Sequence, residues 1–179
     1  VDCIKLVLSK ILDRKPDLCV SGINHGSNAS INVIYSGTVS AAIEASIHDI
    51  PSIAFSLLDH SENAVFAHAE EYIVKIVKKF LTSKSNTCLN VNIPKFSNNP
   101  INGLRVAKQA RGKWIEEFEE RFTPSGDRCF WMTGNYIKDD KSKGADQNLL
   151  EDNYISIVPV QYDLTSYSQI DEIDSLLND

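Results

Sequence analysis

The sequence lacks the features that mark several special classes of protein. Its 179 residues contain no apolar run near the ~18 residues that a membrane-spanning helix needs. The four cysteines form no C-x-x-C pair and match no zinc-binding spacing, so we expect reduced thiols in a cytoplasmic protein. Lysine and arginine are absent from residues 144–179, which carry 8 acids, whereas residues 1–143 carry all 18 basic residues against 16 acids. Neither part has the basic footprint of a nucleic-acid-binding protein, so we expect neither a nucleic-acid polymer nor a membrane as a partner.

The composition that remains is that of one globular domain. Hydrophobic residues make up 42% and charged residues 23% of the chain, which excludes a disordered, collagenous or coiled-coil protein. Apolar spacing then predicts an alternation of elements: helices over 3–12, 38–48 and 65–80, the last with Ser61 as its N-cap, and buried strands over 17–23, 52–57 and 87–93. This alternation predicts an α/β fold, a Rossmann-like and mostly parallel sheet with helices on both faces.

The pattern changes after Pro94. We expect paired or exposed strands over 104–111 and 128–137 with a charged stretch at 116–121 between them, then a strand over 153–161 and an acidic helix over 168–177. We therefore divide the single domain, residues 1–179, into three parts: a core over 1–94, a β-rich oligomerisation excursion over 95–153, and a final strand with a C-terminal tail over 154–179.

The segment Ser21–Thr38 is the most informative for chemistry. It leaves the carboxyl end of a predicted buried strand, where α/β sheets bind ligands, and runs through two glycines into a helix N-terminus. The Ser-Gly-Thr at that helix start offers free N–H groups, the positive end of a helix dipole and two hydroxyls, which suit a phosphate. The segment contains neither a P-loop nor a G-x-G-x-x-G motif. An ordinary helix cap is the alternative interpretation.

Other residues have two interpretations each. Asn24 and Asn28 offer an oxygen ligand for a hard cation or an amide donor for phosphate, and asparagine is also common in plain loops. Trp114, Phe130 and Trp131 suit stacking on a ring, although buried or interface positions are more typical of such side chains.

Three blocks of sequence resemble a known family. They read P-D-L-C-V-S-G-I-N-H-G-x-N, then Y-S-G-T-V-x-A-A-x-E, then P-S-I-A-F-S-L, and they resemble the SurE survival-protein family of metal-dependent phosphatases that act on nucleoside monophosphates. The resemblance continues in order along nearly the whole chain. It implies a SurE-like fold with a β-hairpin excursion and a C-terminal tail that exchanges between subunits, in a homodimer or homotetramer.

The resemblance also assigns site residues. Asn24 matches the family's asparagine ligand to a divalent metal, and Asn28 matches a second asparagine that contacts phosphate. Ser36, Gly37 and Thr38 match the phosphate-binding loop. The implied cofactor is one divalent cation per subunit, Mg²⁺ or Mn²⁺.

The family's paired metal-binding aspartates have no counterpart in these residues. We expect them upstream of Val1, which leaves the catalytic residues unassigned and predicts that this segment alone is inactive. For the complete protein the resemblance implies a 5′-nucleotidase that hydrolyses nucleoside 5′-monophosphates to nucleoside and phosphate, with 3′-monophosphates as a further candidate. The alternative is a catalytically silent oligomerisation or nucleotide-binding module that lacks the aspartate pair.

Overall fold

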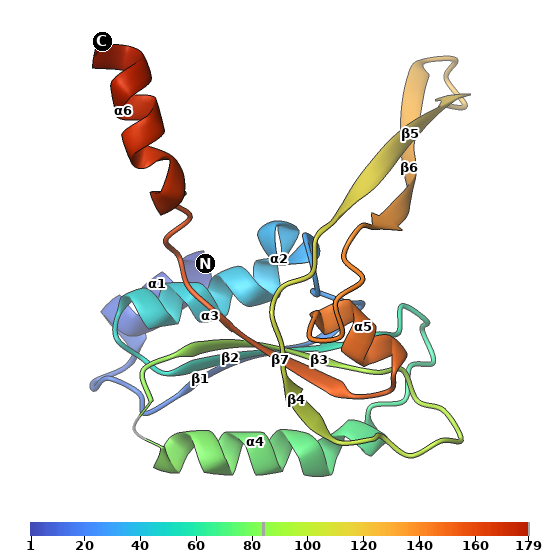
Figure 1. Ribbon diagram of the computed structural model, residues 1–179. Coiled ribbons are helices and arrows are strands. Elements are labelled where there is room, and N and C mark those ends of the chain that lie inside the picture. The colour runs from blue at the N-terminus through green and yellow to red at the C-terminus, as the bar shows by residue number, and fades with distance from the viewer. Residues whose placement is uncertain (84, 179) are drawn as a thin grey trace.

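The computed structural model describes residues 1–83 and 85–178 and shows one central sheet with helices on both faces (Figure 1). Two arms, one a hairpin and one a helix, project from this body on the same side. In chain order the elements are α1 (Asp2–Leu6), a π-helical turn (Val7–Ile11), β1 (Cys19–His25), α2 (Asn32–Tyr35), α3 (Gly37–Ile47), β2 (Ser52–Leu57), a 3₁₀ turn (Ala67–Ala69), α4 (Glu70–Thr82), β3 (Cys88–Ile93), β4 (Leu104–Val106), β5 (Gly112–Phe122), β6 (Arg128–Lys138), α5 (Asp146–Glu151), β7 (Ile155–Val160), a second 3₁₀ turn (Tyr167–Gln169) and α6 (Ile170–Asn178).

The strand order confirms the predicted α/β class. Over the described residues the main sheet has the order β1-β2-β3-β7-β4. Strands β1, β2 and β3 are parallel to one another, β7 runs antiparallel to β3, and β4 runs parallel to β7. Helices α1 and α3 cover one face and α4 covers the other (Figure 1). The sheet is therefore mostly parallel, and its first three strands end at the same edge.

Strand β2 lies in the centre of the hydrophobic core, because helices cover both faces of the sheet there. All six of its residues are buried, and successive side chains point to opposite faces. Phe55 packs in the cluster that includes Ile76 of α4, whereas its neighbour Ala54 packs with Val39 of α3. The continuous apolar run of this strand, rather than an alternating one, follows from burial on both sides.

Two elements differ from the predicted burial. The strand predicted over 17–23 is observed at Cys19–His25, and it lies at the edge of the described sheet with Val20 49% exposed. The helix predicted over 3–12 is present, but Leu6 and Ile11 are 54% and 60% exposed. The periodicity identified these elements correctly, and the expectation that they are buried was wrong at these positions, because β1 is the edge strand of the described sheet and the outer side of the first helix faces solvent.

The prediction that Ser61 caps the long amphipathic helix is also wrong. Helix α4 begins at Glu70, after the 3₁₀ turn Ala67–Ala69. The N–H of Ser61 donates to the carboxylate of Asp59 at 3.0 Å, and its carbonyl accepts from the N–H of Ala64 at 3.2 Å. These bonds hold Ser61 in a loop turn, and the helix begins about two helical turns later than a cap at Ser61 predicts.

The hairpin excursion is confirmed, with one correction. Strands β5 and β6 pair antiparallel from Gly112 opposite Lys138 to Phe122 opposite Arg128 and form the first arm (Figure 1). The charged stretch 116–121 lies inside β5, not between two strands as predicted. Of the strand predicted over 104–111 only Leu104–Val106 forms a strand, and this β4 pairs with β7 in the main sheet instead of with β6. An arm in solvent accommodates charge along a strand, and ion pairs such as Glu120 with Arg128 at 2.6 Å help to pair the strands.

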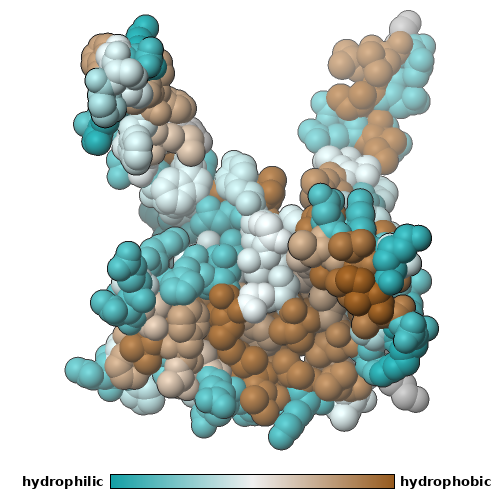
Figure 2. Space-filling model, turned by 180° about the vertical axis from the view of Figure 1, so that it is seen from behind, coloured by the Kyte–Doolittle hydropathy of each residue, from teal (hydrophilic) through white to brown (hydrophobic). Residues whose placement is uncertain are grey.

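The second arm is α6, and both arms expose apolar side chains. Figure 2 shows hydrophobic side chains along the α6 arm, seen from behind. On the two arms and the segment that leads to α6, the exposed large apolar residues include Phe118, Phe122, Phe130, Trp131, Met132, Leu164, Ile170, Ile173, Leu176 and Leu177. Across the residues that the structure describes, every helix is too short or too polar to span a bilayer.

Candidate phosphate and nucleoside site

The site lies where the first three parallel strands end. Asn24 of β1 is level with Ser56 of β2, and Ser56 is level with Asn92 of β3. Ligands of α/β proteins bind beyond this edge of the sheet. Three polar residues therefore lie side by side at this edge, and the two buried ones, Ser56 and Asn92, bond Asn28 of the loop.

The side chain of Asn24 is fixed by its own loop. Its Nδ2 donates to the carbonyls of His25 and Gly26, both at 2.9 Å. Its Oδ1 accepts from the hydroxyl of Thr38 at 3.3 Å. Both amide hydrogens are used within the loop, so the oxygen is the group that Asn24 presents outward. The structure thus brings together Asn24 and Thr38, which the sequence places 14 positions apart.

The segment Ser36–Thr38 forms the N-terminus of α3. The Oγ of Ser36 accepts from the N–H of Val39 at 3.0 Å, so Ser36 is the N-cap. Gly37 is the first helical residue, and a Cβ added there would meet no atom within 4 Å. The N–H groups of the first turn have no helical acceptor, and the helix dipole adds positive potential there. A phosphate can therefore approach the backbone at Gly37 and Thr38 closely.

Asn28 is held more tightly than its loop position suggests. It is 6% exposed, and its Nδ2 donates to the Oγ of Ser56 at 2.6 Å. Its N–H donates to Oδ1 of Asn92 at 2.8 Å, and its carbonyl accepts from Nδ2 of Asn90 at 2.8 Å. Asn28 therefore ties the loop to β2 and β3. Sequence reasoning missed Asn90 and Asn92, although two polar residues two positions apart in a buried strand were a usable signal.

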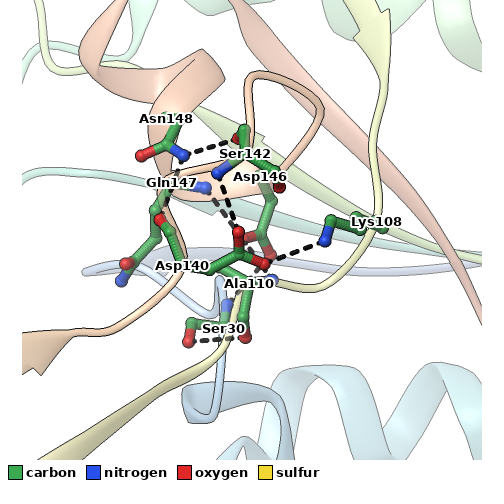
Figure 3. Close-up of polar contacts among 8 residues, drawn as sticks. All are labelled: Ser30, Lys108, Ala110, Asp140, Ser142, Asp146, Gln147 and Asn148. Atoms are coloured by element: carbon green, nitrogen blue, oxygen red, sulfur yellow. Dashed lines mark hydrogen bonds and ion pairs between the residues drawn. The ribbon is translucent and has the colours of Figure 1, made fainter.

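A buried carboxylate anchors the far side of the same loop. Asp146, fully buried at the start of α5, accepts from the N–H of Ser30 at 2.9 Å, of Ala110 at 3.0 Å and of Gln147 at 2.8 Å (Figure 3). Burial raises the pKa of Asp146, and the three N–H donors oppose that rise. No local sequence pattern predicts this anchor, because its partners lie up to 116 positions away in the chain.

A second carboxylate supports the loop that contains Asp146. Asp140 accepts from the N–H of Ser142 at 2.8 Å and from Nζ of Lys108 at 3.0 Å (Figure 3). Hydrogen bonds from Ser142, followed by the Lys108 charge, hold the pKa of Asp140 well below its ordinary value. The charged form of Asp140 is therefore the one that the folded state favours.

We expect Asp140→Asn to reduce the loss of stability that occurs when the pH is lowered into the acid range. Because folding lowers the pKa of Asp140, its contribution is present above the unfolded-state value of about 3.9 and is lost as the pH falls below it. Melting temperatures between pH 7 and pH 3 measure this effect. The variant should show a shallower fall below pH 4 than the unaltered protein, while Asp139→Asn, at the exposed neighbouring carboxylate, should keep the original slope. Equal slopes for both variants would contradict the assignment.

An open cavity of about 460 Å³ is lined by Asn24 and Asn28 and by the aromatic residues Tyr35, Trp114 and Tyr136. The segment Ser36–Thr38 is not part of this lining, but Thr38 bonds the lining residue Asn24. Trp114 is 39% exposed and lines this cavity, whereas Phe130 and Trp131 lie on β6 of the hairpin, outside the lining. Sequence reasoning missed Tyr35 and Tyr136, because nothing in the sequence shows that the base of the hairpin folds back over the loop.

The fit to a divalent cation is partial. The outward Oδ1 of Asn24 is a hard neutral oxygen, a suitable single ligand for Mg²⁺ or Mn²⁺. Among the described residues no group of three or more His, Cys, Asp or Glu side chains is placed to hold a metal ion. These residues therefore supply one ligand and not a complete set, and we derive no chemical step through a metal.

Comparison with known proteins gives consistent matches. A family model described as Survival protein SurE matches residues 1–116. The protein 5′-nucleotidase SurE of Christiangramia forsetii is 51% identical over 181 residues, covering 99% of this chain and 70% of that protein. The protein of the same name from Flavobacterium psychrophilum is 48% identical, covering 98% and 69%. The crystal structure of the SurE protein from Aquifex aeolicus superposes with a TM-score of 0.80 at 36% identity, covering 99% of this chain and 72% of that one.

Proposed function

This chain belongs to the Survival protein SurE family, and we propose that it acts as a 5′-nucleotidase that hydrolyses nucleoside 5′-monophosphates to nucleoside and phosphate. The observation that carries the proposal is the position of Asn24, which bonds Thr38 at the N-terminus of α3 and lines a cavity large enough for a nucleoside. The relatives named 5′-nucleotidase SurE support the same activity, since they match nearly the whole chain.

The phosphate in this proposal binds at the start of α3. Its oxygens accept hydrogen bonds from the N–H groups of Gly37 and Thr38, and the hydroxyls of Ser36 and Thr38 add two more donors. Ser36 already caps the helix as an acceptor, which leaves its hydroxyl hydrogen for the phosphate. Nδ2 of Asn28 gives one hydrogen to Ser56 and keeps a second for the same anion. Donors fixed in this way stabilise the charge that moves among the phosphoryl oxygens in the transition state.

The proposed cofactor is one divalent cation per subunit, Mg²⁺ or Mn²⁺, with Oδ1 of Asn24 as one ligand. When bound, such an ion polarises a phosphoryl oxygen and orients a water molecule. The part of Asn24 is positional: its two Nδ2 bonds keep the oxygen directed outward. The hydroxyl of Thr38 can turn from Asn24 to the phosphate and release that oxygen for the ion.

Release of phosphate from nucleoside monophosphates tests this function. The purified full-length protein should hydrolyse 5′-AMP in Mn²⁺ or Mg²⁺, lose the activity in excess EDTA, and regain it when metal is restored. A parallel series with 3′-AMP measures the preference for the position of the phosphate. Binding of 5′-AMP without phosphate release under any metal would favour a silent nucleotide-binding module and contradict the enzyme proposal.

We further propose that the protein assembles as a homodimer or homotetramer through its two arms. The pairing of Phe118 with Met132 places both on one face of the hairpin, and Phe122 and Phe130 share that face. All four are more than half exposed. Glu120 and Arg128, which pair with each other at 2.6 Å, lie on the same face. A largely apolar face that contains such an ion pair is typical of a surface that another copy covers.

We expect Phe118→Glu to shift the protein to a smaller assembly. A carboxylate at residue 118 would add a second negative charge to a face whose Arg128 is already paired with Glu120, and this charge would be costly to bury against a second copy. Light scattering during size-exclusion chromatography measures the mass of the unaltered protein, of this variant, and of the control Thr133→Glu. Thr133 lies on the opposite face of the hairpin, because it neighbours Met132 in the strand. A monomeric unaltered protein, or an equal shift in both variants, would contradict the proposed interface.

A further inference from the structure

We propose that Trp114 and Tyr35 form the nucleobase slot of this site, where the base of the nucleotide stacks on aromatic rings. The proposal rests on the proposed function, because it assigns the part of the substrate that the phosphate loop does not hold. Two cavities share these two aromatic residues in their linings.

Tyr35 and Trp114 stand at the border of those cavities. Both residues line the cavity that contains Asn24 and Asn28, and both also line a second, more apolar cavity of about 570 Å³. A ligand that reaches from the phosphate side into the apolar side can therefore contact both rings. A nucleoside monophosphate has the matching polarity, with an anion at one end and a flat aromatic ring at the other.

The indole of Trp114 is held in place rather than free to rotate. Its Nε1 donates to Oδ1 of Asn32 at 2.8 Å. Tyr136 makes an edge-to-face contact with it, at 5.5 Å between ring centres and 73° between planes. The hydroxyl of Tyr136 donates to Oγ of the buried Ser30 at 2.6 Å. A T-shaped contact engages at most one face of the indole, so a fixed aromatic surface remains for a ligand.

The geometry near Tyr136 indicates that this arrangement depends on the local sequence. Gly112 begins β5 directly beneath the tyrosine, and a Cβ added there would lie 1.8 Å from the Tyr136 hydroxyl. The absence of a side chain at Gly112 therefore lets Tyr136 reach Ser30 and support Trp114. Tyr35, in contrast, is 70% exposed at the end of α2, which leaves its ring free to close on a bound base.

Stacking predicts broad base selectivity. Every nucleobase offers a π-face to an indole, and such contacts tolerate changes of sequence or base. We expect purine nucleotides to bind more tightly than pyrimidine nucleotides because the larger ring overlaps more of the indole. A sugar phosphate without a base should gain nothing from the slot.

Steady-state kinetics with 5′-AMP and ribose 5-phosphate test the slot in the full-length protein. For Trp114→Ala we expect the KM for 5′-AMP to rise at least about fivefold, with kcat nearly unchanged. The KM for ribose 5-phosphate should change less than twofold, and Trp114→Phe should keep most of the affinity for 5′-AMP. Equal effects on both substrates, or no effect on either, would overturn the proposal.

Fluorescence supplies a readout that is independent of turnover. The chain has two tryptophans, so Trp131→Phe leaves Trp114 as the reporter and Trp114→Phe leaves Trp131. Adenosine should quench the fluorescence of Trp131→Phe saturably and leave the fluorescence of Trp114→Phe unchanged. Equal quenching in both variants, or quenching in neither, would overturn the proposed slot. If the unaltered protein hydrolyses no nucleotide but this quenching occurs, the proposed function fails and the slot remains.

Discussion

Asn24→Asp is expected to lower phosphatase activity about 100-fold, even though it adds negative charge beside the proposed cation. The physical reason lies in the two hydrogens of Nδ2, which bond the carbonyls of His25 and Gly26. An aspartate oxygen at that place would face two carbonyl oxygens and accept nothing from them. The side chain would rotate or the loop would shift, and the oxygen that now faces Thr38 would move with it.

The comparison that decides this prediction pairs Asn24→Asp with Asn24→Ala. Both should lose activity to a similar degree, because neither can make the Nδ2 bonds. The control Asn63→Asp adds the same charge at an exposed position outside the lining of the cavity and should retain full activity. Melting temperatures identify any general loss of fold. If Asn24→Asp were as active as the unaltered protein, the requirement for an amide at this position would be wrong.

The sequence predicts the strands and the helix around this site better than the aromatic residues that line its cavity. Repeating apolar positions located β2, β3 and α3 within a residue or two, because burial on both sides of a sheet leaves a clear pattern. The Ser-Gly-Thr at residues 36–38 predicted a helix N-terminus by local chemistry alone, and α3 begins there. Such features depend on neighbours in the chain, which a single sequence displays.

The aromatic wall depends on contacts over long distances in the chain. Trp114 bonds Asn32 across 82 positions, and Tyr136 bonds Ser30 across 106. No local spacing encodes where the base of a hairpin will lie on a loop. The same reason explains why the sequence did not predict the edge position of β1 or the late start of α4. Both features depend on the elements that pack against these segments and not on the apolar pattern within them.

Asp146→Ala is expected to cost about 3 kcal/mol or more of unfolding free energy, the largest stability effect that the site predicts. The change leaves the N–H groups of Ser30, Ala110 and Gln147 without an acceptor inside the fold. Each unsatisfied buried donor costs about 1–3 kcal/mol, and the three are not additive because the loop can relax. For a domain of this size the melting temperature should fall by roughly 10 °C.

Asp146→Asn separates the hydrogen bonds from the charge. It keeps one acceptor oxygen, so at neutral pH it should lose less than the alanine variant. Burial raises the pKa of Asp146, so in the unaltered protein its ionisation lowers stability as the pH rises from about 3.9 through the raised value. The asparagine variant should lack that fall, and melting curves from pH 4 to pH 7 measure it.

The control for both variants is Asp152→Ala, an exposed acid at the end of α5, which should change stability by less than about 0.5 kcal/mol. If Asp146→Ala unfolded no earlier than this control, water would be replacing the carboxylate as acceptor. Where the fold survives, the KM for 5′-AMP should also rise in Asp146→Ala, because Ser30 then loses the anchor that sets the position of Asn28 and of the loop around it. One buried carboxylate outside the cavity would thus control both the stability of the domain and the shape of its substrate site.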